Sequence, residues 1–214
     1  MHVKDVKQMR TIIMCKAPVT GRVKTRLTPP FTPEEAAQLH CSMAETVIKR
    51  ASTLFSDTWI ASDNISHPFF ERFKLNRVDQ EKGDLGDRMS RLMQWAFNDE
   101  CHSVLFLGTD SPHMSDSRLK HAVALLNSFD LVIGPVEDGG YDLIAMKAPH
   151  TELFTGIQWS SEHVLQETVR QAEFLQLKTE LLDMSFDLDT AESLRRAAPI
   201  WCSPLPLPEK DQEN

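Results

Sequence analysis

The sequence predicts an α/β protein built on a doubly wound, mostly parallel sheet with helices on both faces. Short apolar runs alternate along the chain with longer segments in which apolar residues recur at helical spacing. The chain has 214 residues, of which 41% are hydrophobic, so it can bury one sizeable core in a single domain. Ligands of such sheets bind beyond the carboxyl ends of the strands, and a site is therefore expected at that edge.

Five apolar runs are predicted to form the strands. Each run is short, and each is separated from the next by a helical segment or by a glycine-containing turn. The runs cover residues 11–15, 58–61, 103–107, 131–134 and 141–147.

The clearest helix is predicted over residues 33–54, where apolar residues recur every three or four positions. Thr32 and Glu35 form the pattern of a capping box, and Pro33 takes the first helical position. Three further helices are predicted at 84–97, at 116–127 with Ser115 as its cap, and from Ser160 or Ser161 to Ala172.

Residues 1–198 are predicted to form one domain, and the proline-rich tail, residues 199–214, is predicted to be loosely ordered. The tail shows no helical or strand period. No apolar stretch approaches the ~18 residues of a membrane span. The four cysteines are widely spaced and form no C-x-x-C pair, which is typical of reduced thiols. We therefore expect a cytoplasmic protein without a membrane span.

The net charge of −8 argues against a nonspecific nucleic-acid-binding protein, so the basic loop at residues 16–27 is a local exception. This loop follows the first predicted strand, and it matches neither the P-loop nor the G-x-G-x-x-G pattern. A glycine that allows close approach and several cations would suit a di- or triphosphate, although a solvated basic loop would have the same composition. The candidate phosphate-binding residues are Lys16, Gly21, Arg22, Lys24 and Arg26.

Carboxylates at two distant places in the sequence could hold a hard cation. Asp110 follows the run 103–107, and Asp187 and Asp189 occupy alternate positions of an extended segment. Mg²⁺ or Mn²⁺ would accept such oxygen ligands. The alternative for each aspartate is a turn or a helix cap; Asp187 fits the ligand role better, and Asp189 fits the cap role better.

Two glycine clusters are further candidates for ligand contact. Gly139 and Gly140 follow the run 131–134, where a close approach to a ligand and a plain hairpin turn look alike in sequence. Gly83 lies just before a predicted helix start, where free amides can face an anion or a base.

Six motifs occur in one order along the chain: K-A-P-V-x-G-R-V-K-T-R-L, Q-x-x-G-D-L-G-x-R-M, G-T-D-S-P, D-G-G-Y, W-S-S and D-L-D-T. Over residues 11–197 this set resembles a family of glycosyltransferases within the nucleotide-diphospho-sugar transferase superfamily, which has the GT-A fold. The first motif is also similar, more loosely, to that of phospholactate and molybdopterin nucleotidyltransferases. The resemblance implies a Rossmann-like transferase domain.

The resemblance also implies roles for single residues. It places the basic loop on nucleotide phosphates and makes Asp110 and Asp187 the metal ligands. It sets Gln80, Gly83 and Arg88 at the base or sugar side. It sets Asp138, Gly139, Gly140 and Tyr141 at the donor sugar or acceptor pocket, with Asp110 and Asp138 as the candidate catalytic residues. The chain departs from the family pattern at Glu45, Asp142 and Ala145, so the acceptor side is expected to differ most.

The predicted function is a divalent-metal-dependent glycosyltransferase that uses a nucleotide-diphospho-sugar donor and a small acceptor. Metal and cations would stabilise the departing diphosphate. One alternative is a nucleotidyltransferase that joins a nucleoside triphosphate to a phosphorylated small molecule, because one charged loop suits either leaving group. The other alternative is a non-catalytic nucleotide-binding protein.

Overall fold

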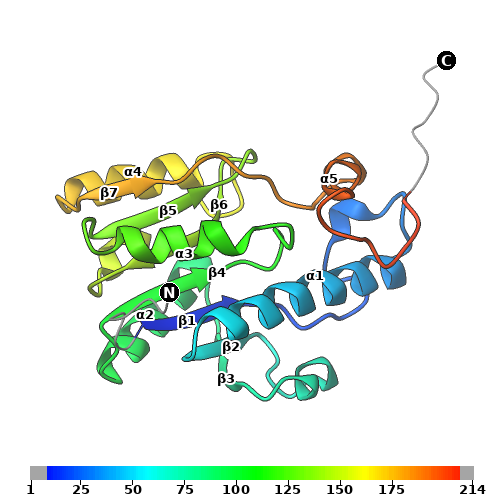
Figure 1. Cartoon of the computed structure of the whole chain (residues 1–214), viewed down its shortest axis with the longest axis horizontal. Coiled ribbons are helices and arrows are strands. Elements are labelled where there is room, and N and C mark those ends of the chain that lie inside the picture. The colour runs from blue at the N-terminus through cyan, green and yellow to red at the C-terminus, as the bar shows by residue number, and fades with distance from the viewer. Residues whose placement is uncertain (1–8, 208–214) are drawn as a thin grey trace.

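The computed structural model describes residues 9–207, which form one seven-stranded sheet with helices on both faces (Figure 1). The strand order is β3-β2-β1-β4-β6-β5-β7; β6 runs antiparallel to β4 and β5, and the other pairs are parallel. This architecture confirms the predicted fold class. The strands are β1 (Met9–Met14), β2 (Thr58–Ser62), β3 (Asn76–Asp79), β4 (Ser103–Leu107), β5 (Leu131–Pro135), β6 (Tyr141–Met146) and β7 (Thr179–Leu181).

All five predicted strands are present, and the two strands that were not predicted lie at the edges of the sheet. β3 has the sequence NRVD and β7 the sequence TEL, and none of their residues is fully buried. An edge strand can remain polar because it packs against few neighbours. Its sequence therefore lacks the apolar run that marks a central strand.

The helices are α1 (Pro33–Leu54), α2 (Leu85–Asn98), α3 (Asp116–Leu125), α4 (Val164–Phe174) and α5 (Ala191–Ala197), with 3₁₀ turns η1 (Thr25–Leu27), η2 (Pro68–Arg72) and η3 (Thr151–Phe154). The capping box of α1 is confirmed: Thr32 accepts from the Glu35 amide, and Glu35 accepts from the Thr32 amide. Ser115 caps α3 as predicted. The predicted serine cap of α4 is wrong, because Ser161 donates to the Gln158 carbonyl and the helix starts later.

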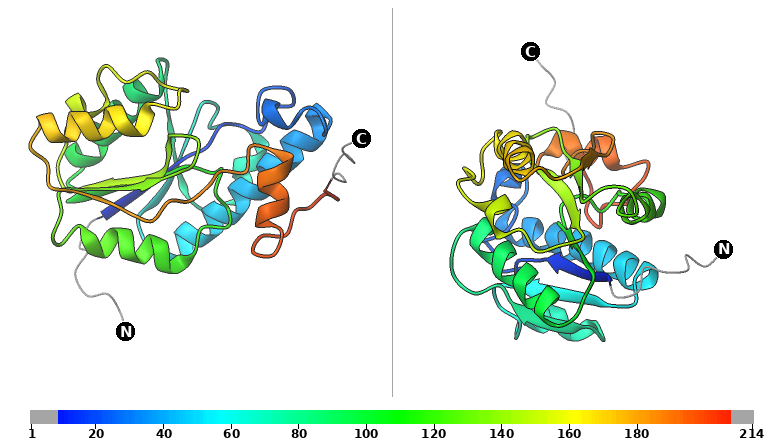
Figure 2. Two further views of the ribbon diagram at one scale, coloured as in Figure 1. Left: turned by 90° about the horizontal axis from the view of Figure 1, so that it is seen from above. Right: turned by 90° about the vertical axis from the view of Figure 1, so that its left-hand side faces the viewer.

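The two faces of the sheet are covered by different helices (Figure 2). α1 and α3 pack on one face, where Ile48 and Ala122 share an apolar core with Leu105 of β4. α2, α4 and η3 pack on the other face, where Met93 and Phe154 meet Phe106, the next residue of the same strand. Adjacent residues of β4 therefore point into opposite cores, as expected for a strand buried on both sides.

A third apolar cluster lies beyond the carboxyl ends of the strands and joins α1, α5 and the start of the tail. Leu27 from the basic loop and Leu188 from the acidic segment are both fully buried in it. Trp201 is 6% exposed, and its Nε1 donates to Thr46 Oγ1 at 3.2 Å. The predicted tail therefore packs on α1 at Trp201, whereas residues 208–214 lie outside the described part of the chain.

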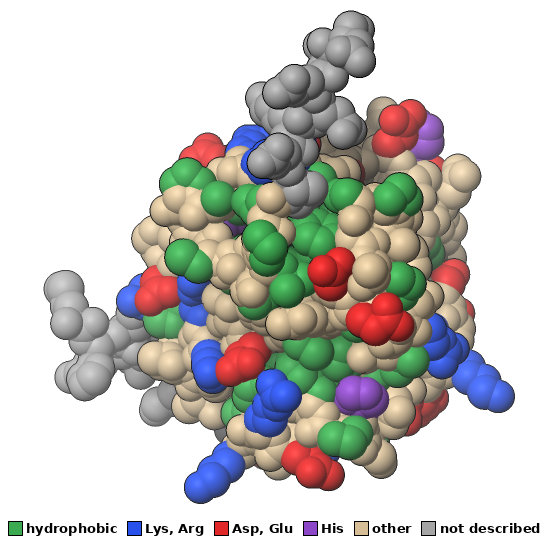
Figure 3. Space-filling model, turned by 90° about the vertical axis from the view of Figure 1, so that its right-hand side faces the viewer, with side chains coloured by type: hydrophobic (Ala, Val, Ile, Leu, Met, Phe, Trp, Pro, Cys, Tyr) green, Lys and Arg blue, Asp and Glu red, His purple; other side chains and the backbone are tan. Residues whose placement is uncertain are grey.

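The surface and the helices give two further findings. Within residues 9–207, no helix is both long and apolar enough to cross a membrane. On the face shown in Figure 3, acidic and basic side chains are interspersed among apolar ones. The described residues thus form no continuous basic surface there of the kind that binds nucleic acid.

Candidate functional site

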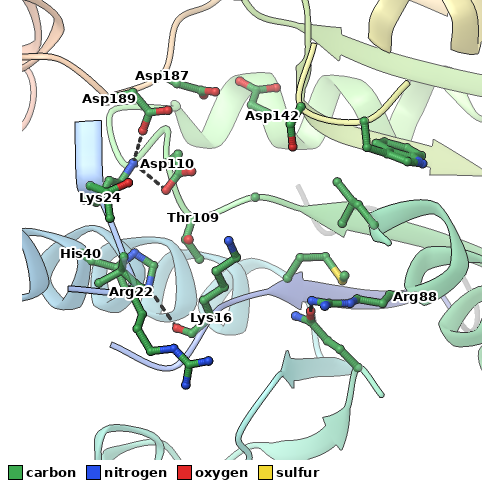
Figure 4. A pocket seen from close by; sticks show the side chains of 18 of the residues that line it. Lys16, Arg22, Lys24, His40, Arg88, Thr109, Asp110, Asp142, Asp187 and Asp189 are labelled. Atoms are coloured by element: carbon green, nitrogen blue, oxygen red, sulfur yellow. Dashed lines mark hydrogen bonds and ion pairs between the residues drawn. The ribbon is translucent and has the colours of Figure 1, made fainter. Parts of the chain in front are cut away.

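A cavity of about 710 Å³ opens where β1 and β4 end (Figure 4). Met14, the last residue of β1, and Gly108, the first residue after β4, both line it. The cavity therefore occupies the carboxyl edge of the sheet, where the sequence predicts a ligand.

Most of the predicted site residues line this cavity. Those that do are Lys16, Arg22, Lys24, Arg26, Gln80, Gly83, Arg88, Asp110, Tyr141 and Asp187. Gly21, Asp138, Gly139 and Gly140 are not among the lining residues. The cavity also contains residues for which the sequence predicts no ligand role, chiefly His40, Asp142, Trp159 and Asp189.

Two side chains hold the start of the basic loop in place. The Ala17 amide donates to Asp63 Oδ1 at 2.8 Å, and His40 Nε2 lies 2.9 Å from the Lys16 carbonyl oxygen. Burial lowers the pKa of His40, so its neutral ring donates from Nε2 to this carbonyl. His40 sits in α1, far from every motif in sequence, and only the tertiary structure reveals its place. The side chains of Lys16 and Arg22 remain exposed at the cavity.

Lys24 differs from the other cations of the loop because its side chain is only 3% exposed. Its Nζ lies 2.7 Å from Asp110 Oδ1, 2.7 Å from Asp189 Oδ1 and 3.1 Å from the Leu188 carbonyl oxygen. Burial by itself would lower the pKa of Lys24, but the two carboxylates outweigh burial and raise it. The backbone of Lys24 has φ +49°, a left-handed conformation that non-glycine residues adopt mainly where the surroundings impose it.

Hydrogen bonds between distant segments bring the metal candidates Asp110 and Asp187 into one cavity. The Leu188 amide donates to the Asp110 carbonyl oxygen at 2.8 Å, and Ser111 Oγ donates to Asp187 Oδ1 at 2.7 Å. Burial would raise the pKa of Asp110, but Lys24 lowers it below its usual range. Burial and the charge of Asp110 raise the pKa of Asp187 to about 7.

The predicted cap role of Asp189 is wrong. Thr190 caps α5, because its Oγ1 accepts from the Ser193 amide at 3.1 Å. Asp189 instead pairs with Lys24, and its Oδ2 lies 3.4 Å from Arg26 Nη1. The side chain that looks like a cap in sequence is therefore part of the cavity's charge network.

The donor set fits a divalent cation that is held partly by its substrate. Asp187 has a carboxylate neighbour in Asp110 and a raised pKa, so a divalent cation between them would relieve their repulsion. Among the described residues, no group of three or more His, Cys, Asp or Glu side chains could hold a metal. Mg²⁺ commonly takes one or two carboxylates and completes its shell with water and substrate phosphates.

The wall formed by β2, β3 and α2 carries the predicted base or sugar residues. Gln80 is buried, with its Nε2 donating to the Ala61 carbonyl at 2.7 Å and its Oε1 accepting from Arg88 Nη1 at 3.2 Å. Arg88 Nε donates to the Gly83 carbonyl at 2.9 Å, which fixes the turn before α2. Trp159 adds an apolar surface to the cavity. This part of the cavity suits a flat, neutral group.

The turn at residues 138–140 supports the fold at this edge. Gly139 has φ +86°, and a Cβ at this position would collide with the Glu162 backbone. Asp138 Oδ1 accepts from the Gly140 amide at 2.9 Å, within the turn itself. Burial raises the pKa of the Tyr141 hydroxyl, which lies near Thr168 of α4. The ligand and catalytic roles expected here remain predictions.

Asp142, one of the departures from the family pattern, is a buried carboxylate. Its Oδ1 lies 3.3 Å from Arg118 Nη2, and its side chain is only 1% exposed. Burial raises the pKa of Asp142 to about 6 even though Arg118 acts in the opposite direction. Gly134 leaves room for this carboxylate, because a Cβ there would collide with Asp142 Oδ1.

Comparison with protein families gives one match. The model of a family described as "Uncharacterized protein conserved in bacteria (DUF2064)" matches residues 47–161, more than half of the chain. The match includes Gln80, Arg88 and Asp110, and the turn at 138–140. It ends at Ser161, before the acidic segment that contains Asp187.

Comparisons with single proteins agree with the fold. A protein from Desulfovibrio desulfuricans G20, described provisionally as a nucleotide-diphospho-sugar transferase, superposes with a TM-score of 0.82 and 29% identity, covering 89% of this chain and 87% of the other. A cytidylyltransferase from Leptospira borgpetersenii superposes with a TM-score of 0.58 at 14% identity, covering 92% and 88%. In sequence, a 2-phospho-L-lactate guanylyltransferase from Methanobrevibacter ruminantium is 22% identical, covering 81% of this chain and 79% of the relative.

Proposed function

This chain belongs to the bacterial family DUF2064, and we propose that it is a glycosyltransferase that moves a sugar from a nucleotide diphosphate to a small hydroxyl-bearing acceptor. Support comes from the fold, which is that of nucleotide-diphospho-sugar transferases, and from the charges of the cavity. The donor's diphosphate would lie between the basic loop and the carboxylates at its far side. The sugar would extend toward Trp159.

The basic loop would act on the leaving group. As the sugar departs, negative charge grows on the diphosphate oxygen, and Lys16, Arg22 and Arg26 would offset it with charge-assisted hydrogen bonds. A divalent cation held by Asp110 and Asp187 would supply further electrostatic stabilisation of the same leaving group. Gln80 and Arg88 would then position the base or the ribose.

The observation that favours sugar transfer is the distribution of cations in the cavity. Among the lining residues that the structure describes, Arg88 is the only Lys or Arg outside the basic loop. Its Nε and Nη1 already donate to Gly83 and Gln80. A phosphorylated acceptor would need a second group of cations opposite the loop, whereas a hydroxyl-bearing acceptor needs none.

Nucleotidyl transfer is the second candidate, and the likeness to the guanylyltransferase of M. ruminantium favours it. In that reaction the basic loop would hold the triphosphate, and a phosphate oxygen of the acceptor would attack the α-phosphorus in line. Pyrophosphate would leave. The two candidates differ in the product that carries the nucleotide.

A two-stage experiment tests the proposal. Nucleoside triphosphates and nucleotide-diphospho-sugars are screened by thermal shift with and without Mn²⁺. A ligand at 100 times its Kd stabilises by about 2.7 kcal/mol, which corresponds to roughly 5–10 °C for a chain of this size. Donors that bind are then incubated with pooled small acceptors and followed by ³¹P NMR. Release of a nucleoside diphosphate supports sugar transfer, and release of pyrophosphate supports the second candidate.

A matched pair of variants locates the binding site. Arg22→Met should weaken binding of the donor, because it removes an exposed cation from the cavity. Lys120→Met removes an exposed cation from α3 and should leave binding unchanged. A protein that binds no nucleotide in the screen would contradict the proposal. Binding without turnover of any donor would favour the non-catalytic alternative.

A further inference from the structure

Lys24 uses its whole hydrogen-bonding capacity inside the protein. A lysine ammonium has three N–H donors, and Lys24 Nζ has three acceptors within 3.1 Å: Asp110, Asp189 and the Leu188 carbonyl. In this arrangement the ammonium keeps no donor for a phosphate. The phosphate-binding role predicted for Lys24 therefore requires it to leave these partners first.

The same contacts place a cation where a divalent ion would bind. Lys24 Nζ contacts one oxygen of Asp110, the aspartate that with Asp187 forms the proposed metal site. An ammonium and a divalent ion that share one carboxylate repel each other strongly in a partly buried cavity. The left-handed backbone of Lys24 directs the side chain back toward the carboxylates, whereas Arg26 remains 63% exposed.

We propose that Lys24 is a built-in counter-cation, which occupies the carboxylates of the empty site and is displaced from Asp110 when a divalent cation binds. This inference rests on the proposed metal site at Asp110 and Asp187. Once displaced, the Lys24 ammonium has free donors for the donor's phosphates. Lys24 is thus a positioning residue in the free protein and a phosphate ligand only after the cation has arrived.

The counter-cation has a consequence for the order of binding. In the nucleotide-free protein a divalent ion must compete with an ammonium that is fixed on the same carboxylate, so its affinity is low. The donor's phosphates lower that barrier, because they supply further oxygens to the metal and new acceptors to Lys24. Metal and donor are therefore expected to bind together, each tightening the other.

Mn²⁺ binding to the nucleotide-free protein tests the inference without measuring activity. Free Mn²⁺ is quantified by electron paramagnetic resonance in titrations of the wild type, Lys24→Met and Arg26→Met. Methionine keeps the length of the lysine side chain and removes its charge. Lys24→Met should bind Mn²⁺ about tenfold more tightly than wild type, because the competing cation is gone. Arg26→Met should change the affinity less than about twofold, since its ion pair is exposed.

A second measurement uses the wild type alone and so does not depend on the folding of a variant. Lysines are reductively methylated and quantified by mass spectrometry with and without Mg²⁺. Lys24 should be protected in the metal-free protein and several-fold more reactive at saturating Mg²⁺. Lys120, which is exposed on α3, serves as the reference and should not change.

The outcomes separate this inference from the proposed function. If Mn²⁺ binds the wild type with nucleotide present, but Lys24→Met shows no tighter binding without nucleotide and Mg²⁺ leaves the labelling of Lys24 unchanged, the counter-cation is wrong and the metal site stands. If Mn²⁺ binds neither protein under any condition, the metal site itself is wrong, and the inference falls with it.

Discussion

Two buried cations of this protein each meet two carboxylates, at opposite ends of the same strand connection. Arg10, in β1, pairs with Asp57 at 2.8 Å and with Asp99 at 2.8 Å. Lys24, in the loop after β1, pairs with Asp110 and Asp189 at 2.7 Å each. The charges are the same, but the surroundings are not.

The surroundings decide what each group can do. The guanidinium of Arg10 lies over Trp59 and Trp95, with its Cζ 5.0 Å and 4.6 Å from their ring centroids. A planar guanidinium suits such stacking, and the two rings seal the group against a ligand. Lys24 has no aromatic cover of this kind, and its carboxylates face a cavity. The comparison indicates that Arg10 stabilises the fold and that Lys24 prepares a site.

The largest expected effect is on stability, at Arg10. Arg10→Met leaves Asp57 and Asp99 without their partner and removes two cation–π contacts, so it should lower the free energy of unfolding by about 3–4 kcal/mol. The affinity of the folded protein for nucleotide should not change. Urea unfolding and calorimetry with nucleotide measure the two quantities. A loss of nucleotide affinity equal to that of Lys24→Met would contradict the distinction between the two cations.

The next effect concerns Asp142, which forms a buried ion pair with a single cation, Arg118. The pKa of Asp142 is raised to about 6, whereas an unfolded aspartate titrates near ~3.9. The folded state therefore binds more protons between these values, and stability should fall as pH rises through that window. A difference of two pKa units corresponds to about 2–3 kcal/mol.

Denaturation of the wild type and of Asp142→Asn, repeated from pH 4 to pH 8, measures this contribution. The variant has no titrating group at this position, so the decrease in stability between about pH 4 and 6 should be smaller by the amount just given. Identical pH profiles would show that Asp142 keeps an ordinary pKa and that its ion pair with Arg118 offsets its burial.

A smaller effect is expected on the coupling of metal and nucleotide. Mn²⁺ should tighten nucleotide binding about tenfold, and nucleotide should tighten Mn²⁺ binding by the same factor. Asp110→Asn preserves the size of the side chain and removes its charge, so it should abolish the coupling. Calorimetric titrations in chelator and in Mn²⁺ measure it. Coupling that survives in Asp110→Asn would mean that Asp110, like the carboxylates around Arg10, is structural.

The smallest effect is expected from the tail. Truncation after Cys202 retains Trp201, the buried anchor, and should shift the melting temperature by only one or two degrees. Trp201→Ala should lower it further, because the tryptophan packs in the cluster that also holds Leu27 and Leu188. A large shift from the truncation alone would show that residues after Cys202 also support the Lys24 end of the strand connection.

The sequence by itself determined the local structure of this protein. The helix Pro33–Leu54 and the strand Ser103–Leu107 begin and end where predicted, because a capping box and an unbroken apolar run act over a few neighbouring residues. The basic loop and Asp110 follow strands, so the rule for parallel sheets placed them correctly at one edge.

The tertiary structure alone decided which charges meet. Asp189 is far from Lys24 in sequence, and its neighbour Thr190 makes the cap that Asp189 was expected to make. His40 looks like any other residue of an amphipathic helix until the loop folds over it. Lys24 looks like a solvated cation in sequence, yet it is buried. An ion pair depends on the distance between two atoms and on the solvent around them, and neither quantity is encoded by spacing along the chain.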